Sequence, residues 1–150
     1  MTLPLETWDD RWSSVHEAAH AVVARYFGLT VELATMDYVC IAHRPYSAPD
    51  CDNSIERLIV NAAGDAATTC FLNWTGTDSG DNQLSRNRLR HLGAGYFRRR
   101  RLMREAREAA LCRVRSLKVE IYAVADALRE RRVLSQVQVD AIIRHCASSR

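Results

Sequence analysis

The pattern of apolar and polar positions predicts that most of this chain is helical. In several segments apolar side chains recur every three or four residues, the spacing that places them on one face of a helix. Glycines follow two of these segments, at Gly28 and Gly93, where helices commonly end. The predicted helices cover residues 8–27, 54–72, 81–91, 96–131 and 136–146.

The start of the first helix can be placed at either of two capping sequences. Thr7 with Asp10 three residues later resembles a capping box, and Ser14 with Glu17 offers a second one. We favour the start at Thr7, because it gives a helix of about 20 residues whose middle is not subject to end fraying.

The remaining segments predict a small β element and loops. Residues 31–42 are rich in β-branched and apolar side chains and predict one or two strands. Prolines and small polar residues predict a loop over 43–53, glycines predict another over 73–80, and Leu134-Ser135 predicts a turn. The expected fold is mainly α with a minor β part, in a single domain over residues 1–150.

The first helix carries the sequence His16-Glu17-Ala18-Ala19-His20, an H-E-x-x-H motif. Positions i and i+4 lie on one face of a helix, so His16 and His20 can bind one zinc ion from the same side. Glu17 can then take a proton from a water molecule that the metal activates. The motif predicts a zinc-dependent hydrolase with Glu17 as general base and one Zn²⁺ per chain.

A zinc ion in such a site needs a third protein ligand. Asp81 is the best candidate, because it follows a glycine-containing loop and begins a predicted helix, where backbone N–H groups orient a carboxylate. Taken alone, Asp81 is also an ordinary helix N-cap. Asp78, in the same loop, is the alternative ligand.

The five cysteines predict reduced thiols that serve mostly as packing residues, since their number is odd and their spacing irregular. Cys40, His43 and Cys51 form a conceivable second metal site, but their spacing matches no zinc module, and we do not favour it. Lys118 is the only lysine, which nearly excludes catalysis by a lysine amine.

The chain offers no transmembrane segment or signal peptide. The most apolar stretch, residues 58–72, is interrupted by Asn61, Gly64 and Asp65. Acidic residues stand near the N-terminus, where a signal peptide would have basic and then apolar ones. We therefore expect a soluble cytoplasmic protein without a membrane partner.

A run of arginines, Arg98 to Arg101, lies beside Tyr96 and Phe97 and among further arginines. Such a patch can bind phosphates, and nucleic-acid binding is an alternative function. We favour a solvated helix face balanced by Glu105 and Glu108, because the chain shows no recognisable nucleic-acid-binding module.

These motifs, taken in order, resemble the FtsH-type ATP-dependent zinc metalloproteases. Residues 16–36, HEAAHAVVARYFGLTVELATM, are similar to the family's zinc-motif helix, turn and strand. Residues 56–72, ERLIVNAAGDAATTCFL, are similar to its A-G-R-A-A-E-E helix, and the chain from Asp81 is similar to its S-N-D-L-x-x-A-T stretch. Residues 121–134, IYAVADALRERRVL, are more weakly similar to its closing helices.

The resemblance implies a helical zincin-like peptidase domain that hydrolyses peptide bonds. It assigns His16, His20 and Asp81 as metal ligands and Glu17 as catalytic base. Asp65 stands where the family has arginine, Thr68 where it has glutamate and Ala19 where it has glycine. The first two differences affect the surroundings of the metal.

The chain contains no phosphate-binding G-x-x-x-x-G-K-[ST] motif for an ATPase. The expected substrate is therefore an unfolded protein or a short peptide, with or without a separate ATPase partner. The resemblance also makes a homo-oligomer conceivable. A further alternative is a metal-binding regulatory or interaction module without catalysis, although the intact Glu17 argues against it.

Overall fold

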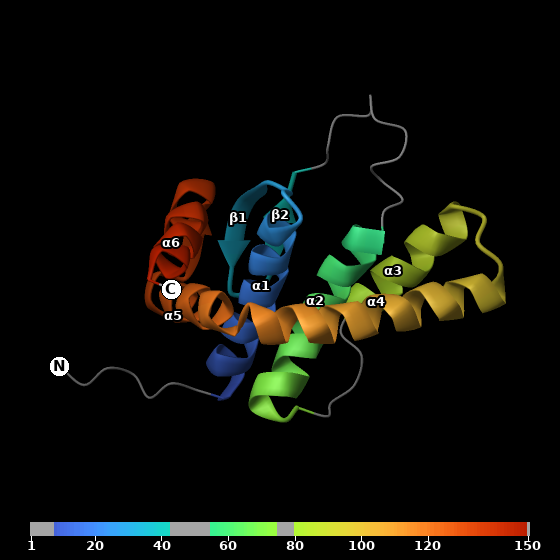
Figure 1. Ribbon diagram of the computed structural model, residues 1–150, viewed down its shortest axis with the longest axis horizontal. Helices are drawn as coiled ribbons and strands as arrows, with labels where there is room; N and C mark the ends of the chain where they lie inside the picture. The colour runs from blue at the N-terminus through green and yellow to red at the C-terminus, as the bar shows by residue number, and fades with distance from the viewer. Residues whose placement is uncertain (1–7, 43–54, 75–79, 150) are drawn as a thin grey trace.

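The computed structural model describes residues 8–42, 55–74 and 80–149, which form six helices and three strands (Figure 1). The mainly helical fold with a small β part is as the sequence predicts. The helices are α1 (Trp8–Tyr26), α2 (Ile55–Leu72), α3 (Gly80–His91), α4 (Tyr96–Ser116), α5 (Lys118–Arg131) and α6 (Gln136–Ser148).

Helix α1 lies at the centre of the molecule, with α2 packed on one side and α5 on another (Figure 1). Its middle is almost fully buried, because apolar side chains such as Val15, Val23 and Ala24 occur on different sides of it there. A helix that is apolar all round belongs in a protein interior. The start at Trp8 agrees with the earlier of the two predicted starts, and Gly28 follows with a φ of 73°.

The three strands form one antiparallel sheet in the order β2-β1-β3. Strand β1 (Val31–Thr35) pairs with β2 (Val39–Ile41) on one side and with β3 (Val133–Ser135) on the other. Strand β2 is therefore an outer strand of the described sheet. The small sheet packs against α1 and α6, as the contacts of β1 show.

The prediction of one continuous helix over 96–131 is wrong, because the helix is interrupted at Leu117. That residue has φ −107° and ψ 19°, and it ends α4 and begins α5. Its N–H still donates to Arg113 and its carbonyl accepts from Ile121, so the backbone changes direction while keeping its hydrogen bonds. No glycine or proline marks the position. The interruption lets α4 pack on α2 while α5 packs on α1.

The predicted turn at Leu134-Ser135 is also wrong, since both residues belong to β3. The change of direction comes earlier, at Arg132, which has a φ of 66°. Leu134 is fully buried and pairs with Ala34 of β1. Pairing with a strand a hundred residues away therefore decides the conformation here, rather than the local sequence.

The described cysteines are free thiols, as predicted, but their role in packing is not general. Only Cys146 is buried, Cys70 is intermediate, and Cys40 and Cys112 are exposed. Cys51 lies outside the described residues. No helix in the described part of the chain is long and apolar enough to cross a membrane.

Candidate metal centre

Three donor atoms from two helices converge on one point beside α1. The Nε2 atoms of His16 and His20 lie 3.1 Å apart. Oδ2 of Asp81 lies 3.0 Å from the first nitrogen and 3.1 Å from the second. Two imidazoles and a carboxylate thus form a nearly equilateral triangle of potential ligands. Among the described residues it is the one group of three or more such side chains with this geometry.

The fold brings these ligands together from distant parts of the sequence. His16 and His20 follow each other by one turn on α1, where the packing of α2 and α5 holds the helix. Asp81 stands in the first turn of α3, 65 residues after His16. Both histidines are buried, and the Asp81 side chain is about one quarter exposed. The triangle therefore lies at the edge of the protein interior, within reach of solvent on the Asp81 side.

The hydrogen bond at the far side of the His20 ring determines which nitrogen faces the triangle. Nδ1 of His20 lies 2.7 Å from the carbonyl oxygen of Val60, and a carbonyl only accepts, so Nδ1 carries the proton. In the neutral ring, Nε2 then presents a lone pair toward Asp81 and His16. Lone pairs facing one another at this distance need a cation between them, so the donor set fits a metal ion.

The electrostatics of the centre agree with that conclusion. Burial by itself would raise the pKa of Asp81, but the rings of His16 and His20 hold that pKa far below its ordinary range. Burial disfavours charge on His20, yet the hydrogen bond and charge of Asp81 outweigh it and raise the His20 pKa. The centre thus stabilises positive charge, whether a proton or a metal ion supplies it.

Gly64 of α2 leaves the space that the two rings occupy. A Cβ atom at this position would lie 2.5 Å from Cε1 of His16 and 2.6 Å from Nε2 of both histidines. Such distances are shorter than real contacts, so any other residue here would displace the ligands. The run of small residues over 62–67 predicts a close approach of another backbone; here α2 packs closely on α1.

A layer of side chains surrounds the His16 ring. Trp12 stacks on it with ring centroids 4.6 Å apart, and Trp74 meets Trp12 edge-on. Oδ1 of Asp65 lies 3.7 Å from Nδ1 of His16, too far for a hydrogen bond, and that buried nitrogen has no hydrogen-bond partner among the described residues. Asp65 thus places a carboxylate close to this nitrogen without bonding to it.

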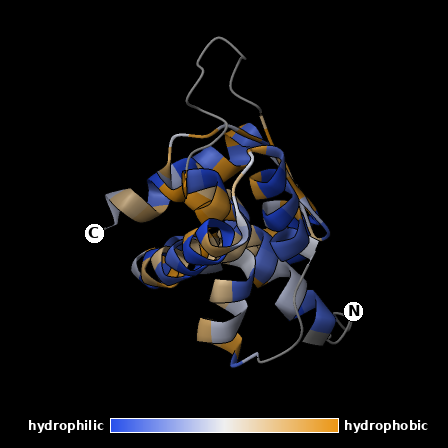
Figure 2. Cartoon of the chain, turned by 90° about the vertical axis from the view of Figure 1, so that its right-hand side faces the viewer, coloured by the Kyte–Doolittle hydropathy of each residue, from blue (hydrophilic) through white to orange (hydrophobic). Residues whose placement is uncertain are grey.

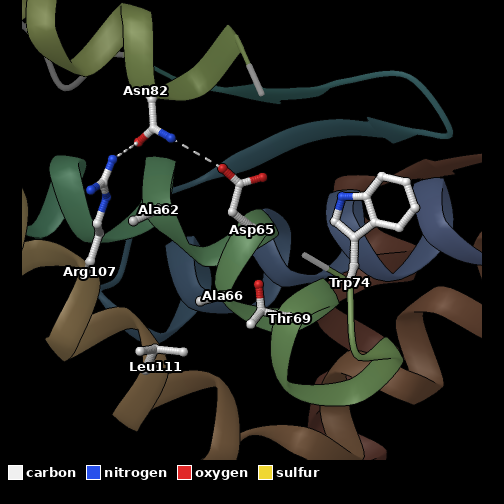
Figure 3. Close-up of a pocket in the computed structure, with 8 residues that line it drawn as sticks. All are labelled: Ala62, Asp65, Ala66, Thr69, Trp74, Asn82, Arg107 and Leu111. Atoms are coloured by element: carbon white, nitrogen blue, oxygen red, sulfur yellow. Dashed lines mark hydrogen bonds between the residues drawn. The ribbon is translucent and has the colours of Figure 1, made fainter. Parts of the chain in front are cut away.

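Asp65 is itself held in place by the side chain of Asn82. The Asn82 amide donates to Oδ2 of Asp65 over 3.3 Å and accepts a hydrogen bond from Arg107, also over 3.3 Å. Figure 3 shows this chain of side chains at one wall of a cavity of about 270 Å³, with Trp74 across from it. Side chains from α3 and α4 therefore hold the α2 carboxylate that stands behind His16.

Glu17 lies on the open side of the centre. Its side chain is buried and lines a cavity of about 220 Å³ together with His20 and Asp81. Val39 and Ile41 of the outer strand β2 line the same cavity. Burial raises the pKa of Glu17 above its ordinary range, and the charges of His20 and His16 offset this only in part. A carboxyl with a raised pKa beside a metal centre suits proton transfer near neutral pH.

The structure places all four predicted site residues together: His16, Glu17, His20 and Asp81. The alternative ligand Asp78 lies outside the described residues, as do His43 and Cys51 of the disfavoured second site. Sequence reasoning missed the roles of Trp12, Gly64 and the Val60 carbonyl. The run of small residues over 62–67 was a sequence feature that pointed to one of them, Gly64.

Comparison with protein-family models gives no match, and comparison with curated proteins gives none either. The resemblance to FtsH-type proteases therefore rests on the motifs quoted above. The geometry shows two buried histidines, His16 and His20, and the partly exposed Asp81, which together can bind a metal ion.

Proposed function

We propose that this protein is a zinc-dependent peptidase of FtsH-like type. One observation carries the proposal: Nε2 of His16, Nε2 of His20 and Oδ2 of Asp81 form a triangle with sides of 3.0–3.1 Å, and Glu17 lines the cavity beside it. This arrangement supports Asp81 as the third ligand and Glu17 as the base that the H-E-x-x-H motif requires.

Zinc is the metal that this donor set suits best. Two imidazole nitrogens and one carboxylate leave a fourth position of a tetrahedral zinc ion open, as in catalytic sites. Ligand atoms about 2.0–2.2 Å from zinc at tetrahedral angles lie roughly 3.3–3.6 Å from each other. The observed triangle is only slightly smaller, so small side-chain movements would accommodate the ion.

The position of Glu17 supports peptide hydrolysis as the proposed reaction. When bound, zinc polarises a peptide carbonyl and lowers the pKa of a water molecule. The Glu17 carboxylate takes a proton from the attacking water and delivers it to the amine that leaves. Burial favours the protonated form of Glu17, which makes the first half of this transfer easier.

Strand β2 offers a way to hold the substrate. It is an outer strand, and its residues Val39 and Ile41 line the cavity that contains Glu17. An extended peptide can pair with such a strand through main-chain hydrogen bonds, independently of its sequence. Because these 150 residues contain no ATPase motif, we propose that the substrate arrives as a short peptide or an unfolded segment, alone or from a partner ATPase.

The first test is metal analysis of the purified protein beside Asp81→Ala. We expect about one zinc per chain in the parent protein, and a zinc affinity lower by roughly 100-fold or more in the variant. Asp126→Ala is the matched control, since Asp126 is an exposed carboxylate on α5 that pairs with Arg129. Equal zinc content in all three proteins would contradict the assignment of Asp81.

The second test separates metal binding from catalysis. Glu17→Gln should keep its zinc and lose at least about 100-fold in hydrolysis of unfolded casein or a quenched fluorescent peptide. Glu130→Gln, an exposed position on α5, is the control that should leave both unchanged. Zinc binding with no hydrolysis by the parent protein would instead identify a metal-binding interaction module.

A further inference from the structure

The two histidines of the metal centre differ in what lies behind their rings. Nδ1 of His20 donates to the carbonyl oxygen of Val60 over 2.7 Å. Nδ1 of His16 is also buried, but it has no hydrogen-bond partner among the described residues. An acceptor stands close to it, Oδ1 of Asp65, at a distance of 3.7 Å. One ring is thus oriented by a hydrogen bond, and the other lies beside a carboxylate that does not yet bond to it.

Metal binding turns Nδ1 of His16 into a buried donor. Nε2 of the same ring points into the triangle of ligands, toward His20 and Asp81. A nitrogen that binds a metal presents its lone pair, so the single proton of the neutral ring is then on Nδ1. A buried N–H without an acceptor destabilises the state in which it occurs. The metal-bound centre therefore requires an acceptor behind His16.

The Asp65 carboxylate can supply that acceptor. A carboxylate offers several lone pairs, so it can accept from His16 while it also accepts from Asn82. The distance from Nδ1 exceeds an ordinary N–H···O bond by about 0.5–1 Å. The Asp65 side chain is about one third exposed and borders a cavity, so it has room to turn. The ligand atoms must themselves move apart by a few tenths of an ångström to admit zinc.

Asp65 also connects the ring of the first ligand with the helix of the third. Asn82 follows the ligand Asp81 directly on α3, and its amide donates to Oδ2 of Asp65 over 3.3 Å. Arg107 of α4 donates in turn to the Asn82 oxygen, as the dashed lines in Figure 3 show. The carboxylate is therefore held on the side away from His16, with its other oxygen toward the ring.

The polar character of α3 gives these bonds weight. Helix α3 and the beginning of α4 lie at the right of Figure 1, and Figure 2, which views the molecule from that side, shows hydrophilic colours along the helices nearest the viewer. Of α3, Asn82, Ser85 and Leu89 are buried. The bond between Asn82 and Asp65 is thus one of the contacts that place the helix of Asp81.

The resemblance to FtsH-type proteases does not imply this acceptor. Asp65 stands where that family has arginine. A guanidinium only donates hydrogen bonds, so an arginine at this position could not accept one from Nδ1 of His16. An acceptor at position 65 is therefore a feature of this chain.

We propose that Asp65 is a positioning residue of the metal centre. In the metal-bound protein its carboxylate accepts a hydrogen bond from Nδ1 of His16 and holds the ring with Nε2 toward the metal. The negative charge also makes the imidazole a stronger ligand than a neutral acceptor would. The proposal rests on the metal binding of the proposed function and not on peptide hydrolysis.

Zinc affinity of the full chain, measured at neutral pH by competition with a chromophoric chelator, is the first readout. We expect Asp65→Ala to bind zinc about 10- to 100-fold more weakly than the parent protein. Asp65→Asn keeps an oxygen acceptor without the charge, so its affinity should lie between the two. Thr69→Ala is the control, because Thr69 is an exposed residue of α2 that lines the same cavity. Circular dichroism shows that the variants remain folded.

Nuclear magnetic resonance of the zinc-loaded protein with nitrogen-15-labelled histidine observes the hydrogen bond itself. We expect slowly exchanging Nδ1–H signals from both His16 and His20. Asp65→Ala should abolish the His16 signal and Asp65→Asn should shift it. The His20 signal should stay in both variants, since its acceptor is the backbone of Val60. A general loss of stability would not select one ring in this way.

Two results would overturn the proposal. One is a zinc affinity of Asp65→Ala equal to that of the parent protein. The other is a His16 Nδ1–H signal that is the same in the parent protein and both variants. A parent protein that binds no zinc would overturn this inference together with the metal centre. Failure of the peptidase alone is read separately, because neither measurement uses hydrolysis.

Discussion

At the scale of single residues, the centre depends on the absence of a side chain at Gly64. Gly64 lets the backbone of α2 approach the His16 and His20 rings to a distance that no Cβ could share. Glycine inside a helix costs about 1 kcal/mol relative to alanine. Its presence in the middle of α2 therefore has a reason outside helix stability, and that reason is the space for the two ligands.

Substituting Gly64 by alanine should separate metal binding from folding. We expect zinc affinity to fall about 100-fold or more, because both rings must move away from Asp81. Zinc titration by calorimetry measures the affinity, and circular dichroism measures the helix content. Gly95→Ala is the control, since a Cβ there meets nothing within 4 Å. An alanine variant that binds zinc like the parent would show that the rings are placed differently.

The pH dependence of hydrolysis and of zinc binding is also set by individual residues. Glu17 acts as a base only when it is ionised, and burial raises its pKa, so hydrolysis should decline as the pH falls through that raised value. The imidazoles must be neutral to bind zinc, so acidification should also release the metal. Asp81 keeps its charge throughout, because its pKa is held far below the ordinary range.

The two effects can be measured separately. Zinc content of Glu17→Gln as a function of pH reports the ligands alone, and hydrolysis by the parent protein reports Glu17 in addition. A loss of activity at a pH where Glu17→Gln still holds its zinc reports the protonation of Glu17. A zinc affinity that does not fall as the pH falls through the acidic range would contradict ligation by the two histidines.

At the scale of elements, α3 is the helix that a metal bound to Asp81 would stabilise most. Only Asn82, Ser85 and Leu89 of this helix are buried, and two of them are polar. Its polar contacts with α2 include the bonds from Asn82 to Asp65 and from Asn61 to Ser85. A helix with so little apolar burial has a low local stability, and a ligand bond from Asp81 would tie it to α1.

Removing the metal should therefore loosen α3 first. We expect amide hydrogen exchange over residues 80–91 to accelerate about tenfold or more after treatment with a chelator, while exchange in α1 and α5 changes little. Exchange measured by mass spectrometry on short peptides resolves the three helices. The Asp81→Ala protein is the control, since its exchange should not respond to the chelator. A uniform increase throughout the chain would instead mean that the metal stabilises the whole fold.

At the scale of the molecule, the centre is assembled where α1, α2 and α3 meet. Helix α1 provides two ligands and Glu17, α2 provides the Val60 carbonyl and the space at Gly64, and α3 provides Asp81. The sheet adds β2 at the edge of the cavity that Glu17 lines.

Local periodicity was sufficient to predict the helices apart from the interruption at Leu117, the small β part and the zinc-type motif, because each of these depends on residues close together in the sequence. The same holds for His16, Glu17 and His20, whose spacing is set by the helix itself. Asp81 could be proposed as the third ligand from its place at a helix start and from the family resemblance, but both arguments left Asp78 open.

The tertiary structure alone decided the features that depend on distant parts of the chain. The interruption at Leu117 and the strand at Leu134 follow from packing against α1 and β1, and no local residue signals either. The tautomer of His20 depends on a carbonyl 40 residues away, and the need for glycine at position 64 depends on rings that another helix supplies. Residues that are neighbours only in the folded chain fix the chemistry of this centre, which is why the sequence by itself could name its ligands but not the surroundings that hold them.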